Sequence, residues 1–153
     1  MILWRISNYQ DLSGKGGITA GARWHNAGRP VVYTASSPAS ALLEILVNLE
    51  LADVQDLPVS YTLLEIEVPD SLPIPELSEV DLGNQWKNET ARTRAIGDGW
   101  LASASSALLS IPSAIVPFTQ NYLINPMHSD SQRIRILSAG PYPHEPRLLR
   151  KKC

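Results

Sequence analysis

The chain has 153 residues, of which 44% are hydrophobic and 18% charged, and its net charge is -2 at pH 7. This length and composition predict one soluble globular domain with a core of its own. The sequence shows no apolar run long enough to span a membrane, no secretory signal pattern and no basic bias typical of nucleic-acid binding. The only cysteine, Cys153, cannot form an internal disulfide, which favours a cytoplasmic location.

The first part of the chain predicts two strands and one capped helix. Residues 2–6 and 30–34 carry the apolar, β-branched and aromatic residues of short strands, whereas the Gly- and Ser-rich residues 11–22 predict a loop. A helix is expected over residues 36–51, with Ser37 as N-cap and Pro38 at the first helical position. Its expected buried stripe consists of Ala39, Leu42, Leu43, Leu46 and Val47.

The remaining segments predict short strands and one further helix. Strands are expected at residues 59–68, 111–117, 122–126 and 133–137, and a helix interrupted at its Gly-Asp-Gly is expected over residues 88–107. Residues 69–80 are Pro-rich and irregular. The pattern indicates an α+β fold around a small, mostly antiparallel or mixed sheet, as one domain with a core of about residues 2–137 and a tail at 138–153.

Charge is distributed unevenly along the chain. Between Pro30 and Trp86 there is no Lys or Arg, but there are ten acidic residues, from Glu44 to Asp81. Two interpretations stay open, a solvated acidic surface or an acidic face for a basic partner.

Several common kinds of site are not expected. The glycines of residues 13–21 match neither the P-loop nor the dinucleotide-binding spacing. The three histidines lie far apart, so no metal site is expected, and no serine lies in a nucleophile elbow.

Three side chains within 22 residues are candidates for chemistry: Arg23, Tyr33 and Glu44. An arginine can bind a phosphate group in a bidentate manner, and a carboxylate can stabilise developing positive charge. Taken singly, each also has an ordinary structural explanation. Ser113 lies in the strand predicted at residues 111–117, where a buried hydroxyl group needs a partner.

Four segments, in order, resemble one known family. Residues 21–46, 97–103, 111–117 and 121–128 resemble the RES domain, the toxin half of a bacterial toxin–antitoxin pair, named for an Arg, a Glu and a Ser. The resemblance extends from about Arg5 to Ile136. Two positions depart from the family pattern, since Ala22 replaces a glycine and His25 stands where asparagine is usual.

The resemblance implies an ADP-ribosyltransferase-like fold, with a split mixed or antiparallel sheet flanked by helices around a NAD-binding cleft. It implies NAD⁺ as the substrate, with phosphate as an optional co-substrate and no bound cofactor or metal. The implied catalytic residues are Glu44, Arg23 and Tyr33. The implied substrate-binding residues are Arg5, Trp24, Ser113 and Asn125.

The implied partner is a helix-turn-helix antitoxin of the Xre type, and a homodimer within the toxin–antitoxin complex is an open alternative to a single copy. The expected activity is cleavage of the nicotinamide–ribose bond by hydrolysis or phosphorolysis. Two alternatives remain: a mono-ADP-ribosyltransferase that modifies a protein, and a non-catalytic module that binds a nucleotide or a protein. A nuclease is disfavoured by the negative net charge.

Overall fold

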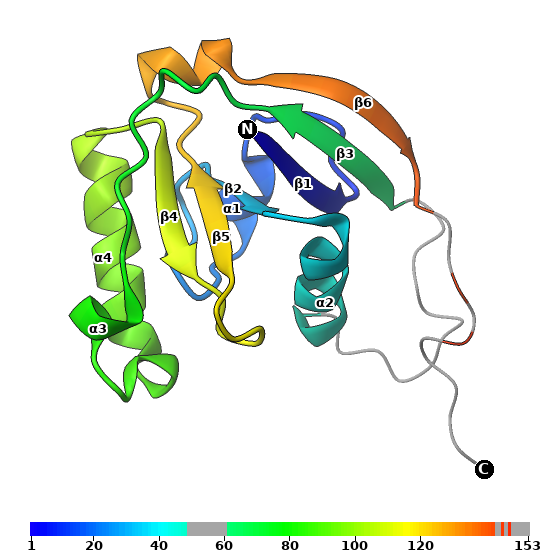
Figure 1. Cartoon of the computed structure of the whole chain (residues 1–153). Helices are drawn as coiled ribbons and strands as arrows, with labels where there is room; N and C mark the ends of the chain where they lie inside the picture. Colours follow the sequence, from blue (N-terminus) through cyan, green and yellow to red (C-terminus); the bar gives the residue numbers. More distant parts are fainter. Residues whose placement is uncertain (49–60, 143–144, 146, 148–153) are drawn as a thin grey trace.

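Six strands form one antiparallel sheet among the residues that the computed structural model describes, which are 1–48, 61–142, 145 and 147 (Figure 1). The strand order is β4-β5-β2-β1-β3-β6, and every registered strand pair is antiparallel. The strands are β1 Ile2–Ser7, β2 Val32–Ala35, β3 Thr62–Glu67, β4 Leu108–Pro112, β5 Gln120–Ile124 and β6 Arg135–Pro141. The predicted α+β class is therefore confirmed. The tail prediction is wrong at its start, because β6 continues the sheet to Pro141.

The helical elements are α1 Lys15–Thr19, α2 Pro38–Asn48, α3 Glu79–Leu82, η2 Trp86–Asn88, α4 Thr90–Ser103 and η3 Ser129–Arg133. Only the two longest helices, α2 and α4, are predicted from the sequence. The Gly-rich segment predicted as a loop contains α1, and α4 runs without interruption through the Gly-Asp-Gly sequence. Among these described elements no helix is long and apolar enough to cross a membrane.

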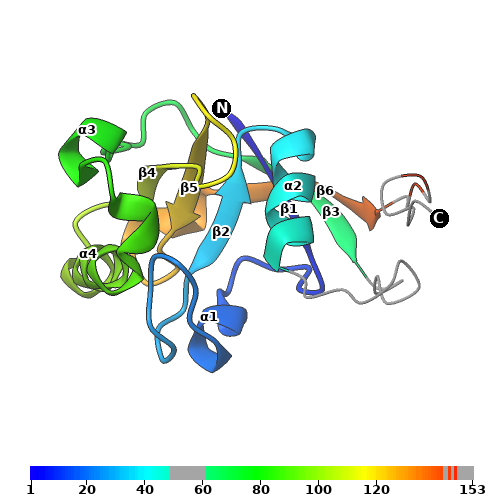
Figure 2. The same cartoon turned by 90° about the horizontal axis from the view of Figure 1, so that it is seen from below.

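Strand pairing within the sheet is shortest between β1 and β2. The two strands share one registered pair, Trp4 with Ala35, whereas β1 and β3 pair over six residues each. The split implied by the resemblance therefore corresponds to a weak junction within a continuous sheet. Helix α2 packs on both β1 and β2 and covers this junction (Figure 2).

Two groups of helices cover one face of the sheet. Residues paired across strands, or two apart along a strand, share a face. Tyr33 and Ala35 pair with Leu123 and Asn121 respectively, so these four side chains lie on one face, which we call the helical face. One hydrophobic cluster on it contains Leu123 and three tryptophans contributed by the 21–26 segment, η2 and α4. A second contains Ala35 and the inner side of α2. The opposite face is packed by the remaining cluster, which includes Leu3, Leu64 and Ile66.

Helix α2 begins as predicted but faces the other way. The Ser40 backbone N–H donates to Ser37 Oγ at 3.1 Å, which confirms Ser37 as the cap. The predicted buried stripe is confirmed at Leu42, which packs on the same cluster as Ala35, but it is wrong at Leu43 and Val47. These two side chains are 45% and 61% exposed, whereas Ala41 and Ile45 pack on the sheet. Rotation of about 100° per residue places these two pairs on opposite sides of the helix.

Candidate active site

Glu44 is the central carboxylate of the helical face. Its Oε1 accepts hydrogen bonds from Ser113 Oγ at 2.9 Å and from Asn121 Nδ2 at 2.5 Å. Glu44 comes from α2, Ser113 follows β4 and Asn121 is in β5, so three distant segments converge on one oxygen atom. The structure thus brings together two residues that the sequence predicted for the site, Glu44 and Ser113, and adds Asn121.

The two donors select which oxygen of Glu44 remains available. Among the described residues no donor bonds to Oε2, so this oxygen is the one that can meet a ligand. Ser113 Oγ in turn accepts backbone N–H bonds from Ile115 at 3.3 Å and Val116 at 3.0 Å, which orients its own proton toward Glu44. The clamp therefore fixes the carboxylate before any ligand arrives.

Asn121 has an unsatisfied buried acceptor, which its hydrogen bond to Glu44 explains. Its Oδ1 is buried and has no hydrogen-bond partner, a situation that costs about 1–3 kcal/mol. The amide group gives its N–H to Glu44 at the expense of that orphaned acceptor. Polar groups left unsatisfied in a native interior are uncommon and often mark function. In the sequence, Asn121 is a polar residue directly before the strand predicted at residues 122–126.

The Tyr33 hydroxyl group is held by one donor and one acceptor of the 24–25 segment. His25 Nε2 contacts the Gly17 carbonyl oxygen at 3.1 Å, so in the neutral ring this nitrogen carries the proton and Nδ1 accepts from the Tyr33 hydroxyl at 2.8 Å. The Trp24 backbone N–H donates to the same hydroxyl at 3.2 Å. Burial raises the pKa of Tyr33 above its usual value, against a smaller lowering by the Trp24 N–H, so the hydroxyl stays neutral.

His25 and the Gly-rich segment therefore have structural explanations. His25 is 1% exposed and connects Gly17 to Tyr33. A Cβ atom at Gly17 would lie 2.6 Å from the Arg29 carbonyl oxygen and 3.0 Å from His25 Nε2, so only glycine allows α1 to approach this closely. The Ala22 departure is also tolerated, since Ala22 does not have a positive φ.

Arg23 lies at the edge of the helical face, against η2. Its Nη1 donates to the Lys87 carbonyl oxygen at 2.8 Å, and its guanidinium carbon lies 5.7 Å from the centre of the Trp86 ring. Tyr33 and Asn121 are diagonal neighbours on β2 and β5, a relation that places Cα atoms about 7–8 Å apart. Arg23, Tyr33 and the Glu44 clamp are thus arranged along the same face.

Helix α4 holds the backbone of the 22–26 segment in place. Thr93 Oγ1 donates to the Arg23 carbonyl oxygen at 2.6 Å, and Arg94 Nε donates to that of Ala22 at 2.7 Å. Asp98 accepts from the backbone N–H of Asn26 at 3.1 Å and from its side chain at 2.7 Å. These contacts explain why the Gly-Asp-Gly-Trp-Leu sequence accompanies an arginine more than 70 residues earlier in the chain.

Arg5 does not join the other candidates, and its predicted role beside Arg23 is wrong. Trp4 and Ile6 pack under α2 on the helical face, so Arg5 between them points to the opposite face. Its register partner, Leu64, belongs to the cluster of that opposite face. There Arg5 Nη1 donates to the Asp11 carbonyl oxygen at 3.2 Å.

Trp24 and Asn125 also have structural rather than ligand-facing positions. The Trp24 side chain is 2% exposed and packs in the tryptophan cluster, so its ring presents no surface to a substrate. Asn125 is 1% exposed, donates to the Leu101 carbonyl oxygen at 3.3 Å and accepts from the Met127 N–H at 3.0 Å. The predicted direct contacts of both side chains with substrate are therefore not supported.

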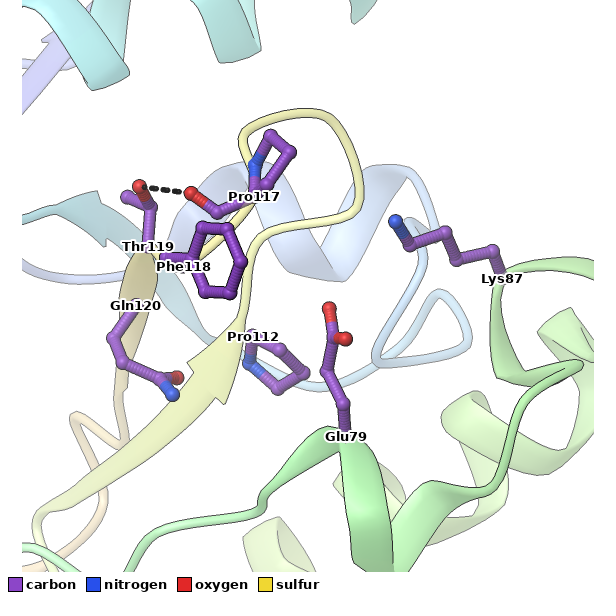
Figure 3. Close-up of a pocket in the computed structure, with 7 residues that line it drawn as sticks. All are labelled: Glu79, Lys87, Pro112, Pro117, Phe118, Thr119 and Gln120. Atoms are coloured by element: carbon purple, nitrogen blue, oxygen red, sulfur yellow. Dashed lines mark hydrogen bonds between the residues drawn. The ribbon is translucent and has the colours of Figure 1, made fainter.

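A pocket of about 320 Å³ lies between the end of the β4–β5 hairpin and the segments that carry Glu79 and Lys87 (Figure 3). Two of its lining residues, Pro112 and Gln120, directly precede Ser113 and Asn121, and its far wall carries Lys87. Pro117 and Phe118 of the β4–β5 loop supply an apolar wall opposite Lys87. The full lining is Glu79, Lys87, Pro112, Pro117, Phe118, Thr119 and Gln120.

The acidic residues that the structure describes between residues 44 and 81 do not form a single face. Glu50, Asp53 and Asp56 lie outside the described residues. The other acids are dispersed over different elements with local partners: Glu67 pairs with Arg135, Asp70 with the N-terminal amine, and Asp81 caps α3. A partner surface built on this stretch is not supported by their placement.

Comparisons with known proteins identify the family of this chain. A family model described as the RES domain matches residues 2–145. The chain is 49% identical to "Toxin Res" of Pseudomonas putida, over 89% of this chain and 92% of that protein. It is 39% identical to the "Prs ADP-ribosylating toxin" of a Sphingobium species, over 97% of this chain and 96% of that protein. It shares the fold of a chain in the crystal structure of the Mycobacterium tuberculosis MbcT–MbcA toxin–antitoxin complex, with a TM-score of 0.69, 17% identity, and coverage of 96% of this chain and 85% of that chain.

Fold and site together define a small α+β protein that carries a clamped glutamate, an arginine and a tyrosine with a buried hydroxyl group on one side of its sheet. The chain belongs to the RES domain family.

Proposed function

We propose that this protein is the toxin of a toxin–antitoxin pair and that it acts on NAD⁺ by breaking the nicotinamide–ribose bond. The observation that carries the proposal is the clamp on Glu44, which holds Oε1 with two donors and leaves Oε2 available on the helical face. Relatives named as Res toxins, at up to 49% identity, support the assignment.

The chemistry requires stabilisation of a cation. When nicotinamide departs, positive charge develops on the ribose ring, and the leaving group is already cationic, so no strong general acid is needed. A carboxylate fixed beforehand stabilises this charge without reorganisation in the transition state. Glu44 Oε2 would face the ribose, Arg23 would bind the diphosphate and the ring of Tyr33 would stack on nicotinamide or pack on the ribose. The Tyr33 hydroxyl is already occupied by His25 and Trp24 and does not take part.

The acceptor of ADP-ribose can be water, phosphate or a protein. Transfer to a protein is the second candidate, since one relative at 39% identity is named an ADP-ribosylating toxin. The antitoxin partner is supported by the fold shared with a toxin–antitoxin complex, and an Xre-type antitoxin remains our expectation. Co-expression with the adjacent gene product and measurement of the complex mass would test that partner and the copy number of the toxin.

The test of the activity is nicotinamide release by the purified chain. Glu44→Gln keeps the acceptor oxygen for Ser113 and Asn121 but removes the charge, so the rate should fall by about 10²–10³-fold. Glu67→Gln, a solvent-facing glutamate paired with Arg135, is the matched control and should retain wild-type activity.

Product masses then assign the acceptor. Free ADP-ribose indicates water, its phosphate ester indicates phosphorolysis, and label from NAD⁺ on a lysate protein indicates transfer. A folded Glu44→Gln protein that releases nicotinamide at the wild-type rate would refute the proposed mechanism.

A further inference from the structure

Two cations lie on the same buried tryptophan beside the candidate active site. The guanidinium carbon of Arg23 and the ammonium nitrogen of Lys87 each lie 5.7 Å from the centre of the Trp86 ring. Arg23 also donates to the backbone carbonyl oxygen of Lys87 at 2.8 Å. The positions of the two cations are therefore coupled through one ring and one hydrogen bond.

These cations have no anionic partner in the part of the chain that the structure describes. None of its salt bridges involves Arg23 or Lys87. By contrast, Arg92, Arg133 and Arg135 each form one. Adjacent like charges without a counter-ion repel each other, so their retention side by side points to an anion that is bound in another state of the protein.

The pocket of Figure 3 is a candidate binding site for this anion. Lys87 reaches into it from η2, opposite the apolar wall of Pro117 and Phe118. Its single acidic lining residue is Glu79, so Arg23 and Lys87 together with Glu79 leave one excess positive charge at the pocket. Pro112 and Gln120 of the same lining are adjacent in the chain to Ser113 and Asn121, so the pocket and the candidate active site lie at the same end of the β4–β5 hairpin, although Gln120 faces the other side of the sheet from Asn121.

Because Arg5 lies on the opposite face of the sheet, it does not supply a second cation for the diphosphate. Two linked phosphates need more than one cation, and Lys87 is on the correct side, next to Arg23. We propose that Lys87 and Arg23 form a two-cation site for the diphosphate of a dinucleotide, with Lys87 as a substrate-binding residue and the pocket as the place of the adenosine half. This inference rests on the proposed function, since NAD⁺ is the dinucleotide.

The charge of Lys87 can be separated from its packing on Trp86. Lys87→Met keeps an aliphatic chain over the ring and removes the charge, Lys87→Arg restores the charge, and Lys15→Met in the exposed helix α1 is the matched control. Loss of one charge-assisted contact predicts a rise in the KM for NAD⁺ of about tenfold at nearly constant kcat in Lys87→Met. Lys87→Arg and Lys15→Met should keep the wild-type KM.

ADP and adenosine distinguish a phosphate contact from a general loss of binding. In calorimetric titrations, Lys87→Met should weaken ADP binding about tenfold and leave adenosine binding unchanged, and added salt should reduce the difference. Equal ADP affinities in wild type and Lys87→Met, or no ADP binding by the wild type, would overturn the inference. A lower kcat at unchanged KM would also overturn it. A wild-type protein that binds ADP through Lys87 but releases no nicotinamide would instead refute the proposed function and leave the cation site standing.

Discussion

Gly97 allows α4 to touch the backbone of the segment that carries Arg23. An ideal Cβ at position 97 would lie 1.7 Å from the Trp24 carbonyl oxygen, whereas Cβ contacts in proteins are essentially never shorter than 3.0 Å. In Gly97→Ala the helix and the 22–26 segment must therefore separate by at least 1.3 Å, the difference between these two distances. The atom that is met is backbone, so no side-chain rotation can relieve the contact.

The magnitude follows from two opposing terms. Overpacking costs about 1–3 kcal/mol, and a backbone contact this short belongs at the upper end. Alanine in place of a helical glycine returns about 1 kcal/mol. The net loss of about 2 kcal/mol should lower Tm by about 4–8 °C in a chain of this length. Because Thr93 and Arg94 bond to the same segment, Arg23 should move with it, and a shift of about 1 Å can cost about 10²-fold in rate.

Gly99 provides the matched control within the same helix. It is exposed, and a Cβ there would meet no atom within 4 Å. Gly99→Ala should therefore raise Tm by about 2–4 °C and leave nicotinamide release unchanged. Thermal melting by circular dichroism and initial rates well below both Tm values test the pair. If Gly97→Ala melts as high as Gly99→Ala, the argument from the Trp24 contact is incorrect.

Two further substitutions test the roles assigned within the site. Tyr33→Phe leaves His25 Nδ1 and the Trp24 N–H without their partner. We therefore expect the free energy of unfolding to fall by about 1–3 kcal/mol, with kcat nearly unchanged. A hundredfold lower kcat in the folded variant would show that the hydroxyl group takes part in the chemistry. Asn121→Asp replaces the donor to Glu44 Oε1 by a second carboxylate at hydrogen-bonding distance, and repulsion should reduce kcat by about 10²-fold or more. Wild-type kcat in a folded Asn121→Asp protein would contradict the clamp.

Local signals in the sequence are sufficient for β1, β2 and β3 and for the start of α2, whereas the strands predicted at residues 111–117, 122–126 and 133–137 are displaced from β4, β5 and β6. Alternation identified β3, β-branched residues identified β2, and Ser37 with Pro38 located the helix start. The Gly-Asp-Gly sequence predicts a break that α4 does not have, because helix propensity is a local quantity. The reason for Gly97 is a carbonyl group more than 70 residues away, which no local pattern reveals.

The same limit applies to the site. Arg23, Tyr33, Glu44 and Ser113 were identified through the resemblance, but only the register of β1 shows that Arg5 faces away from them. Lys87 carried no signal at all, because its place beside Arg23 depends on how η2 packs against the 22–26 segment.

The orientation of α2 shows why its hydrophobic pattern failed where it did. The stripe with Leu43 and Val47 is the more apolar side of the helix, and burying it would direct Glu44 away from the sheet. Instead Ala41 and Ile45 pack inward, and Glu44 reaches Ser113 and Asn121 from the margin of that packed side. Complete burial of Leu43 and Val47 would stabilise the protein by about 1.5–3 kcal/mol for each side chain, and most of this stabilisation is absent because both are largely exposed. A departure from hydrophobic patterning of this size is expected where function sets the orientation. The exposed side of α2 is therefore itself an argument that Glu44 is the residue for which this helix is positioned.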